Sequence, residues 1–370
     1  MPTPTNAPTS TTGGREVQDP ALFASLTERQ AMPQTSQPIK GLAKSQRLIL
    51  EKVGVVARIR LLITATWKAN AAEEIFNNPG MPYKLIREIA LQANGVTGII
   101  DCAATVLHQR RMRIYRNPVS AITALTTKPG TKYLKAATQT TTFVVEIPIA
   151  HDMLSLIGAL LAQNEETGLS LQITWASEEE IVTGGKIEAF SGEVEWASTV
   201  FSIGSTVVGK QEVTVLPDLS AFHGLVQSET PLTGTGNRKA ELIRTAGQLL
   251  CYTATILNKA GGEVQLPPAE WLTFKLEYGG NKDPLVWTPA SELLEENADD
   301  YDGPLRITGS AAATTALDFL AIDNERDNPA RDMIIPESLT ELRAVIGVPA
   351  GFTPTNAIIL TSQETLYPAV

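Results

Sequence analysis

The chain has 370 residues, a formal net charge of −10 and two cysteines. Because a single hydrophobic core usually stops growing at roughly 250–300 residues, we expect two domains. A nucleic-acid-binding protein usually carries a basic surface, so the acidic balance argues against direct contact with DNA or RNA. Cys102 and Cys251 are far apart in apolar segments, which predicts buried free thiols rather than a disulfide framework or a zinc site.

The N-terminal segment MPTPTNAPTSTTGG has neither the charged region nor the apolar region of a signal peptide. No uninterrupted apolar run approaches the ~20 residues that a helix needs to cross a bilayer. These two features predict a soluble protein.

Residues 1–45 are polar and predict an N-terminal arm, because such a composition buries too little apolar surface to fold alone. Within this arm, Pro20–Met32 is a candidate short helix, with Asp19 placed to cap its first turn. The helix would present one apolar stripe, which could dock on the chain itself or on a partner. The candidate partner-binding residues are Leu22, Phe23 and Leu26.

From Leu48 onward, short segments of alternating apolar and polar residues predict β-strands, and Lys52–Trp67 is the longest of them. Clusters of Gly, Pro and Asn separate most segments, which favours a β-sandwich over a βαβ fold. The other expected strands are Leu85–Ala93, Gly98–Leu107, Thr142–Ile149, Leu169–Trp175, Lys186–Phe190, Gly192–Ile203, Val213–Leu216, Gln248–Leu257, Glu270–Tyr278, Leu305–Thr308 and Ala316–Ile322.

Two pairs of segments indicate an internal repeat. Arg60–Ala72 is similar to Gln248–Gly262, and Thr140–Asp152 is similar to Thr314–Asp327. The pairs occur in the same order with similar spacing, so a duplicated β-domain is more probable than chance similarity between short strands.

His151 and Asp152 are the first candidates for acid–base chemistry, since they follow an apolar strand that ends at Pro148. Adjacent side chains diverge in a strand or a turn, and Asp152 is well placed to cap a helix over Met153–Gln163. The sequence has no G-x-S-x-G motif to supply a nucleophile. We therefore expect a turn between a strand and a helix, and no catalytic residue.

Charged residues are unevenly distributed along the chain. His108–Pro118 contains four arginines, whereas residues 291–303 and 322–332 are rich in carboxylates. The acidic segments lack the EF-hand spacing, which favours solvated loops over calcium sites. The arginines could bind nucleic acid, but pairing with the acidic region, within a chain or between subunits, is an equally good interpretation.

Four framework features occur in order between Leu48 and Glu229: Gly54 before the first long strand, Pro82–Ile86 after a loop, Ile147–Ala150 at a strand end that leads into Met153–Ala162, and Leu216–Ser220. In this order they resemble the major capsid proteins of tectiviruses, tailless phages with an internal membrane whose coat belongs to the adenovirus-hexon lineage. The chain departs from the family pattern at Ala103-Ala104, where a Ser-Gly pair is usual; this concerns a loop rather than the fold.

The resemblance implies an all-β fold of two side-by-side eight-stranded antiparallel jelly rolls with short loop helices. The implied divisions are an arm over 1–45, a first jelly roll over 46–209, a second over 210–357 and a C-terminal extension over 358–370. The implied function is a major capsid protein whose pseudo-hexagonal homotrimers tile an icosahedral shell around an internal membrane vesicle.

The implied partners are other copies of the chain in the same and neighbouring trimers, penton, minor capsid or membrane proteins, and the internal membrane surface. The protein would be made soluble in the host cytoplasm and would reside in the virion capsid. No enzymatic activity, cofactor or metal is expected.

Two other classes remain open as hypotheses. A carbohydrate-binding or carbohydrate-active β-sandwich would need exposed aromatic side chains, but four tryptophans lie in strand-like runs and are expected in the core: Trp67, Trp175, Trp196 and Trp271. A trimeric phage spike would be expected to carry a fibrous or repeat segment, which the sequence lacks.

Overall fold

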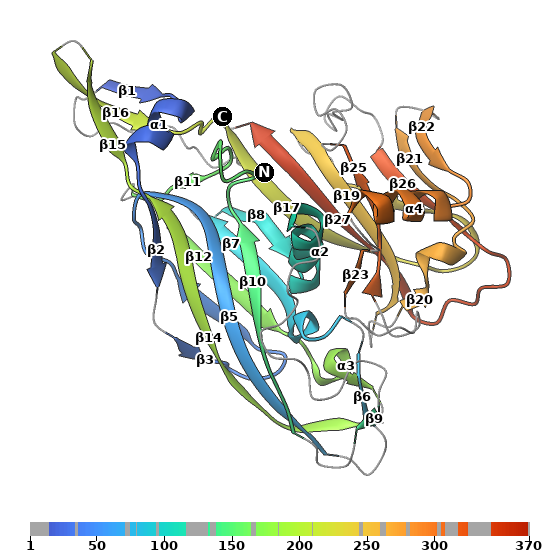
Figure 1. The fold of residues 1–370 in the computed structure, drawn as a ribbon. Coiled ribbons are helices and arrows are strands. Elements are labelled where there is room, and N and C mark those ends of the chain that lie inside the picture. Colours follow the sequence, from blue (N-terminus) through green and yellow to red (C-terminus); the bar gives the residue numbers. More distant parts are fainter. Residues whose placement is uncertain are drawn as a thin grey trace.

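The computed structural model describes residues 15–33, 36–70, 75–78, 80–93, 96–115, 132–133, 138–163, 168–183, 185–208, 210–243, 247–259, 264–278, 282–301, 305–307, 317–324 and 342–368. These residues form mainly β-strands, arranged as two jelly rolls side by side (Figure 1). Among them, no helix is both long enough and apolar enough to cross a membrane.

The first jelly roll consists of two antiparallel four-stranded sheets that face each other. One sheet has the order β2-β14-β5-β10 and the other has the order β4-β12-β7-β8. The strand bounds are β2 Arg29–Pro33, β4 Ser45–Ile49, β5 Val55–Asn70, β7 Ile86–Ala93, β8 Val96–Cys102, β10 Thr138–Pro148, β12 Leu169–Trp175 and β14 Lys186–Phe201.

The second jelly roll is built in the same way. Its sheets have the orders β17-β27-β19-β25 and β18-β26-β21-β22, again antiparallel. The strand bounds are β17 Ala221–Pro231, β18 Gly236–Glu241, β19 Gln248–Asn258, β21 Phe274–Tyr278, β22 Lys282–Trp287, β25 Leu320–Asp323, β26 Leu342–Val348 and β27 Ala357–Pro368.

The two rolls have the same strand order. When the eight strands of each roll are numbered along the chain, one sheet reads 1-8-3-6 and the other reads 2-7-4-5 in both rolls. Both repeated sequence pairs fall on equivalent strands: β5 and β19 are third strands, while β10 and β25 are sixth strands that pair with them. The predicted duplication is therefore confirmed at the level of topology.

Strands β8 and β17 join the two rolls into one continuous sheet. They run parallel, with Leu225 opposite Ile100 and Val226 opposite Asp101. Because β17 lies at the edge of one roll and β8 at the edge of the other, this pairing removes two exposed strand edges that would otherwise favour aggregation.

The remaining elements are short. The helices that the described residues form are α1 Pro20–Leu26, α2 Ala104–Tyr115, α3 Glu178–Ile181 and α4 Ser291–Asp300, together with the 3₁₀ turns η1 Tyr83–Leu85 and η2 Pro268–Glu270. The small strands are β1 Arg15–Gln18, β3 Gln37–Pro38, β6 Ile75–Asn77, β9 Lys132–Tyr133, β11 Leu160–Leu161, β13 Val182–Thr183, β15 Gly204–Val208, β16 Gln211–Leu216, β20 Val264–Leu266, β23 Arg306–Ile307 and β24 Leu317–Asp318.

Each roll encloses a hydrophobic core of its own, and a third cluster lies under α1. Phe143 and Trp175 are buried in the first core, while Trp271 and Phe274 are buried in the second. The four tryptophans that were expected in the core are at most 5% exposed. The third cluster forms around Phe23 of α1.

Described residues of the expected arm and of the expected extension belong to the rolls, which corrects these two divisions. Strand β2 and the short β3 both pair with β14, so residues of the expected arm 1–45 supply an edge strand of the first roll. Residues of the expected extension 358–370 form most of β27, which lies between β17 and β19 inside the second roll. The sequence of these segments does not show which strands they pair with, so their place in the sheets is visible only in the folded chain.

The helix expected over Pro20–Met32 ends at Leu26, and its last residues belong to β2, which begins at Arg29. Three other local expectations were wrong. The helix expected over Met153–Gln163 is a series of turns ending in β11, with Leu156 and Gly158 at positive φ. The strand expected over Gly98–Leu107 ends at Cys102, where α2 follows after one residue. The acidic loop expected at 291–303 is mostly the helix α4. For Met153–Gln163, packing against neighbouring elements outweighed local propensity. For α4, the leucine, glutamate and alanine residues are good helix formers, so local propensity agrees with the helix and the acidic composition was misinterpreted as a loop.

Candidate functional site: the charged junction between the rolls

Helix α2 brings two arginines into the boundary between the rolls. Arg110 and Arg113 are three residues apart and therefore lie on the same side of the helix. Their side chains are only 7% and 6% exposed. Such burial of guanidinium groups requires paired carboxylates, because an uncompensated buried charge is strongly unfavourable.

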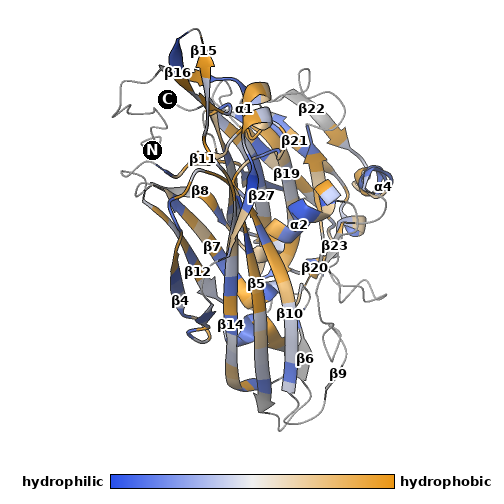
Figure 2. Ribbon diagram, turned by 60° about the vertical axis from the view of Figure 1, so that its left-hand side comes forward, coloured by the Kyte–Doolittle hydropathy of each residue, from blue (hydrophilic) through white to orange (hydrophobic). Residues whose placement is uncertain are grey.

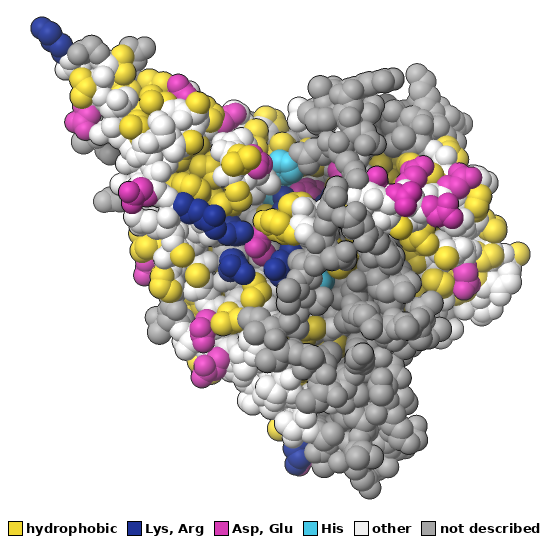
Figure 3. Space-filling model, viewed as in Figure 1, with side chains coloured by type: hydrophobic (Ala, Val, Ile, Leu, Met, Phe, Trp, Pro, Cys, Tyr) yellow, Lys and Arg dark blue, Asp and Glu magenta, His cyan; other side chains and the backbone are white. Residues whose placement is uncertain are grey.

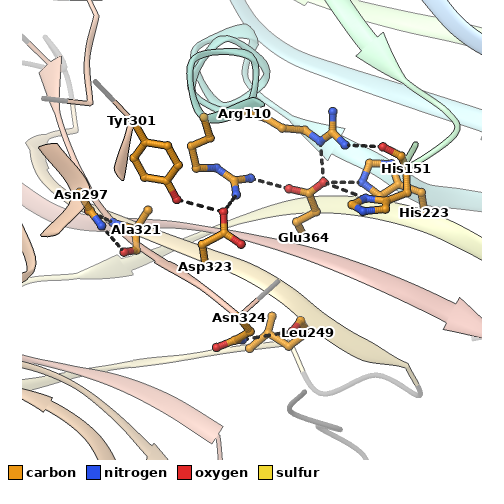
Figure 4. A network of polar contacts seen from close by, with 11 residues as sticks. Arg110, His151, His223, Leu249, Asn297, Tyr301, Ala321, Asp323, Asn324 and Glu364 are labelled. Carbon is orange, nitrogen blue, oxygen red and sulfur yellow. Dashed lines mark hydrogen bonds and ion pairs between the residues drawn. The ribbon is translucent and has the colours of Figure 1, made fainter. Parts of the chain in front are cut away.

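Glu364 of β27 is the carboxylate that both arginines share (Figure 4). Nε of Arg110 donates to Oε1 of Glu364, and Nη2 of Arg113 donates to Oε2. Nη2 of Arg110 also donates to the carbonyl oxygen of His151 at 3.1 Å. The final strand of the second roll is thus bound to the helix of the first roll through both carboxylate oxygens.

Asp323 of β25 extends the network on the other side of Arg113. Nη1 of Arg113 donates to Oδ2 of Asp323 at 3.0 Å, and the hydroxyl of Tyr301 donates to the same oxygen at 2.9 Å. Next to it, the side chain of Asn297 in α4 makes two hydrogen bonds with the backbone of Ala321. Helix α2 therefore binds β27 and β25 of the second roll, and Tyr301 and Asn297 make hydrogen bonds to β25 from the side of α4 (Figure 4).

His223 of β17 closes the network from the strand next to β27. Its Nδ1 lies 3.1 Å from the carbonyl oxygen of Pro148, and its Nε2 lies 2.8 Å from Oε1 of Glu364. Both partners are acceptors, so a protonated ring would satisfy both contacts. Burial acts against that charge and lowers the pKa of His223, although the hydrogen bond to Glu364 opposes this effect and the charge of Arg110 adds to it.

The charge of Glu364 is fixed by its surroundings. Burial alone would raise the pKa of this carboxyl group, but the Coulombic attraction of Arg110 and Arg113 outweighs burial and holds the pKa well below its ordinary value. Glu364 is therefore ionised at neutral pH, and the two arginines and two carboxylates of the network balance.

Ligand atoms of His151, His223 and Glu364 lie within 4.8 Å of one another, a spacing at which a metal ion could be held. However, a divalent cation there would lie next to Arg110 and Arg113, whose charges already neutralise Glu364. The donor set suits an ion-pair network better than a metal centre, since like charges repel strongly in a buried site.

His151 and Asp152 lie in a turn and their side chains have different partners, as the sequence predicted. Nδ1 of His151 lies 3.6 Å from Oε1 of Glu364, whereas Oδ2 of Asp152 accepts a hydrogen bond from the backbone N–H of Ser155 at 2.7 Å. Asp152 therefore caps a turn, although the helix that it was expected to begin is absent. The third histidine, His108, is buried elsewhere and stacks on Tyr83 with ring centroids 3.9 Å apart.

The arginine-rich segment and the acidic region do meet, within one chain. Arg113 binds Asp323, which confirms the pairing interpretation of His108–Pro118 for these two residues. The segment beyond Tyr115, and residues 325–332 of the second acidic stretch, lie outside the described residues.

Helix α1 docks on its own chain. Phe23 is 1% exposed and packs against Val55, Ala57 and Val215, so it cannot serve as a surface anchor. Leu22 is half-buried and Leu26 is 39% exposed. Partner binding through Leu22 and Leu26 stays a prediction. As predicted, Oδ1 of Asp19 caps this helix by accepting from the N–H of Leu22 at 3.0 Å.

Sequence reasoning did not identify Glu364 or His223 as junction residues. Glu364 was not considered as a buried residue because the C-terminal segment was interpreted as an extension outside the jelly rolls. One signal was available, since Glu364 stands in AIILTSQETLYP, a strand-like run with no other charged residue. A lone carboxylate in such a strand indicates a buried partner.

No protein-family model and no curated protein matches the sequence. Solved structures match nearly the whole chain. The STIV MCP, from Sulfolobus Turreted Icosahedral Virus, covers 92% of this chain and 97% of its own, with a TM-score of 0.65 and 11% identity. The PBCV-1 virus capsid covers 96% of both chains, with a TM-score of 0.57 and 9% identity.

The Faustovirus major capsid protein covers 92% of this chain and 90% of its own, with a TM-score of 0.50 and 6% identity. The chain has the double jelly-roll fold. The predicted all-β double jelly roll is thus confirmed by the strand order and by these structures. The narrower tectivirus assignment stays a prediction.

Proposed function

We propose that this double jelly-roll chain is a viral major capsid protein, a coat subunit that assembles with its own copies into an icosahedral shell. The observation that carries the proposal is the end-to-end similarity to capsid chains, at 92% of this chain and 97% of the STIV MCP. The junction supports it physically, because a buried ion-pair network makes the two rolls a single rigid building unit. Its role is structural and not enzymatic.

The assembly unit in this proposal is a homotrimer, in which six jelly rolls give a pseudo-hexagonal outline that packs into flat facets. Interfaces within such a trimer would be large and partly apolar, whereas contacts between trimers would be smaller and more polar. Light scattering during size-exclusion chromatography tests this directly. Three chains of 39.8 kDa predict a mass of about 119 kDa that resists dilution. A stable monomer would contradict the trimer and the shell.

The N-terminal segment is the candidate for contacts with neighbouring trimers or with an underlying membrane vesicle, because its sequence is polar with one short helix. Penton, minor capsid and membrane proteins are proposed as further partners, with the subunit made in the host cytoplasm. Since β2 and β3 belong to the first roll, a truncation test must end before them. Removal of residues 1–14 should leave the mass of the assembly unit unchanged but impair shells seen by electron microscopy.

The carbohydrate alternative loses support. The four core tryptophans are buried, and Trp287 is partly buried and donates from Nε1 to Glu296 at 3.0 Å. A sugar-binding platform needs exposed aromatic faces, so we do not propose it.

A further inference from the structure

The hairpin formed by β15 and β16 links the two rolls and projects beyond the end of the first roll (Figure 1). It follows β14, the last strand of the first roll, and precedes β17, the first strand of the second. Strand β16 lies in the middle of a three-stranded sheet, with β1 parallel on one side and β15 antiparallel on the other. Strand β15 is therefore an edge strand of this small sheet.

The root of the hairpin is packed against the body of the first roll. Val215 of β16 is fully buried in the cluster under α1. At the start of β15, a Cβ atom on Gly204 would lie 3.0 Å from Cβ of Leu26, so α1 is in close contact with this end of the strand. Just before it, the backbone N–H of Ser202 donates to the carbonyl oxygen of Glu28 at 3.3 Å. The part of β15 that is left open is therefore the stretch beyond Gly204.

The tip of the hairpin is open on both faces. Val207 and Val208 are 68% and 58% exposed, and successive side chains of a strand point to opposite faces, so each face carries one exposed valine. Figure 2 shows β15 as hydrophobic beside a hydrophilic part of β16, and Figure 3 shows hydrophobic side chains on the projecting hairpin. A partner that covers one face would leave one valine in water, whereas a strand added to the edge places side chains beside both.

Strand β15, with the sequence GSTVV, lacks the protection that the other sheet edges have. Exposed edges of natural sheets usually carry charged residues or proline, which prevent pairing with other chains. Among the edge strands of four or more residues in the described part of the chain, all except β15 contain such a residue: Glu16 in β1, Arg29 in β2, Arg47 in β4, Glu146 in β10, Lys239 in β18, Asp283 in β22 and Asp323 in β25. The β-branched side chains of β15 instead favour strand pairing.

The charges near β15 do not select a partner. Lys210 in the turn and Glu212 of β16 lie near the tip, while Glu28 and Arg29 lie near the root, so both signs occur at each end. Oγ of Ser205 donates to Oε1 of Glu212 at 2.7 Å, which engages that carboxylate within the hairpin. The choice of partner therefore rests on the backbone edge and on the uncharged side chains of the strand.

We propose that β15 pairs with β15 of a second copy of this chain, antiparallel across a two-fold axis, and joins the two three-stranded sheets into one continuous sheet. A two-fold contact presents the same surface on both copies, so an uncharged edge meets an uncharged edge rather than one that carries charge or proline. Pairing of the stretch Ser205–Val208 with itself places Thr206 of one copy opposite Val207 of the other, and Ser205 opposite Val208. The projection of the hairpin gives a second copy access to this edge (Figure 1).

The contact joins one trimer to the next. A two-fold contact links copies in pairs, so it does not close a three-fold ring; combined with a trimer, it extends the assembly into a lattice. Pairing over one short strand makes a small contact, which is typical of units that associate weakly and reversibly. This inference rests on the proposed function and adds which strand connects the trimers.

The first test measures whether the two edges meet in the full-length chain. Thr206→Cys combined with Val207→Cys brings thiols opposite each other between copies, while the natural Cys102 and Cys251 are buried. Oxidation with diamide should give at least about tenfold more disulfide-linked dimer on a non-reducing gel than the control, because a disulfide forms only between closely opposed side chains. The matched control is Gln30→Cys with Ala31→Cys, an exposed adjacent pair on the edge strand β2. Equal cross-linking in the two variants would contradict the contact.

The second test measures association by sedimentation over a dilution series. Val207→Lys gives the edge the residue that most often protects natural edges, and it should raise the dissociation constant between trimers at least about tenfold without changing the mass of the trimer. Leu154→Lys is the matched control, since Leu154 is 87% exposed outside the hairpin, and it should leave association unchanged. A comparable loss in Leu154→Lys would indicate a general apolar contact and overturn strand pairing. Melting temperatures check that each variant remains folded.

The outcomes separate this inference from the proposed function. Trimers that form larger assemblies, with cross-links at 206 and 207 and loss of the larger assemblies in Val207→Lys, support both. Trimers without cross-links above the control overturn the contact and leave the proposed function standing. A dimer that Val207→Lys dissociates supports the contact and contradicts the trimer. A monomer at every concentration overturns both.

Discussion

Arg110 of α2 and Glu364 of β27 are 254 residues apart in the sequence and form a buried ion pair across the boundary between the two jelly rolls. The pair forms part of a network in which one carboxylate accepts from two arginines, next to a buried histidine. Neither roll contains the whole network, so its groups are satisfied only when both rolls are folded and in contact. The junction therefore couples the folding of one roll to the other.

Replacement of Glu364 tests this coupling. Glu364→Gln keeps the shape of the side chain but leaves Arg110 and Arg113 without their shared negative charge. We expect the free energy of unfolding to fall by about 3–5 kcal/mol, as for other buried ion pairs that lose one partner. Urea unfolding measures this change. Glu229→Gln removes an exposed pair with Lys259 and should cost less than about 1 kcal/mol. Equal losses in the two variants would contradict a structural role of the network.

The stability of the protein should fall on acidification in two stages. His223 has a lowered pKa in the fold, so below its ordinary value of 6.5 the unfolded chain binds a proton that the folded chain does not. Glu364 behaves likewise below its ordinary value of 4.5, because its folded pKa is also lowered. In both windows the unfolded state binds more protons, and stability therefore decreases as pH falls.

Melting temperatures between about pH 7 and pH 5 isolate the histidine stage. The natural chain should lose stability over this range, and His223→Gln should lose less, because the contribution of His223 is gone. The contribution of His108, whose pKa burial lowers to about 3, is present in both chains. The comparison uses the slope against pH, so an overall loss of stability in the variant does not affect it. Parallel slopes for the two chains would exclude His223 as the responsible group.

Gly158 is required by the turn that replaces the expected helix after Asp152. Its φ is +85°, and a Cβ atom there would lie 2.8 Å from Cβ of His223 and 2.9 Å from its backbone nitrogen. Gly158→Ala should therefore lower the free energy of unfolding by about 1–3 kcal/mol, from backbone strain and displacement of β17. Gly168→Ala meets no atom within 4 Å and should be nearly neutral. Thermal unfolding of both variants decides whether the tight approach to His223 matters.

Phe23 should be the residue that holds α1 in place. Phe23→Ala removes a ring that is 1% exposed. We expect the free energy of unfolding to fall by about 3–5 kcal/mol, or the N-terminal segment to detach locally. Leu26→Ala, at 39% exposure, should change stability little. Limited proteolysis of the N-terminal segment, together with melting temperatures, distinguishes the two. Resistance to protease in Phe23→Ala would show that β1 or the strands β2 and β3 hold this segment instead.

The local sequence pattern was sufficient to predict the bounds of a strand or helix where neighbouring residues mark its ends. Leu169–Trp175 has the predicted bounds, and Gln248–Leu257 differs from β19 by one residue. Asp19 and Pro20 predicted the start of α1 because the capping geometry involves only neighbouring residues. Pattern failed for α4, whose acidic outer side resembles a solvated loop, and for Met153–Gln163, whose apolar residues pack in turns rather than along a helix.

The sequence by itself predicted the β-rich class, the repeat and the buried tryptophans, and it offered the pairing of arginines with an acidic region as one of two interpretations. These properties follow from composition, periodicity and charge, which can be read from residues that are close together in the sequence. Only the tertiary structure decided that the first and last strands belong to the rolls, and that Glu364 meets Arg110, Arg113 and His223. Strand partners and buried ion pairs join residues hundreds of positions apart, and no local pattern specifies which distant groups will meet once both rolls are packed.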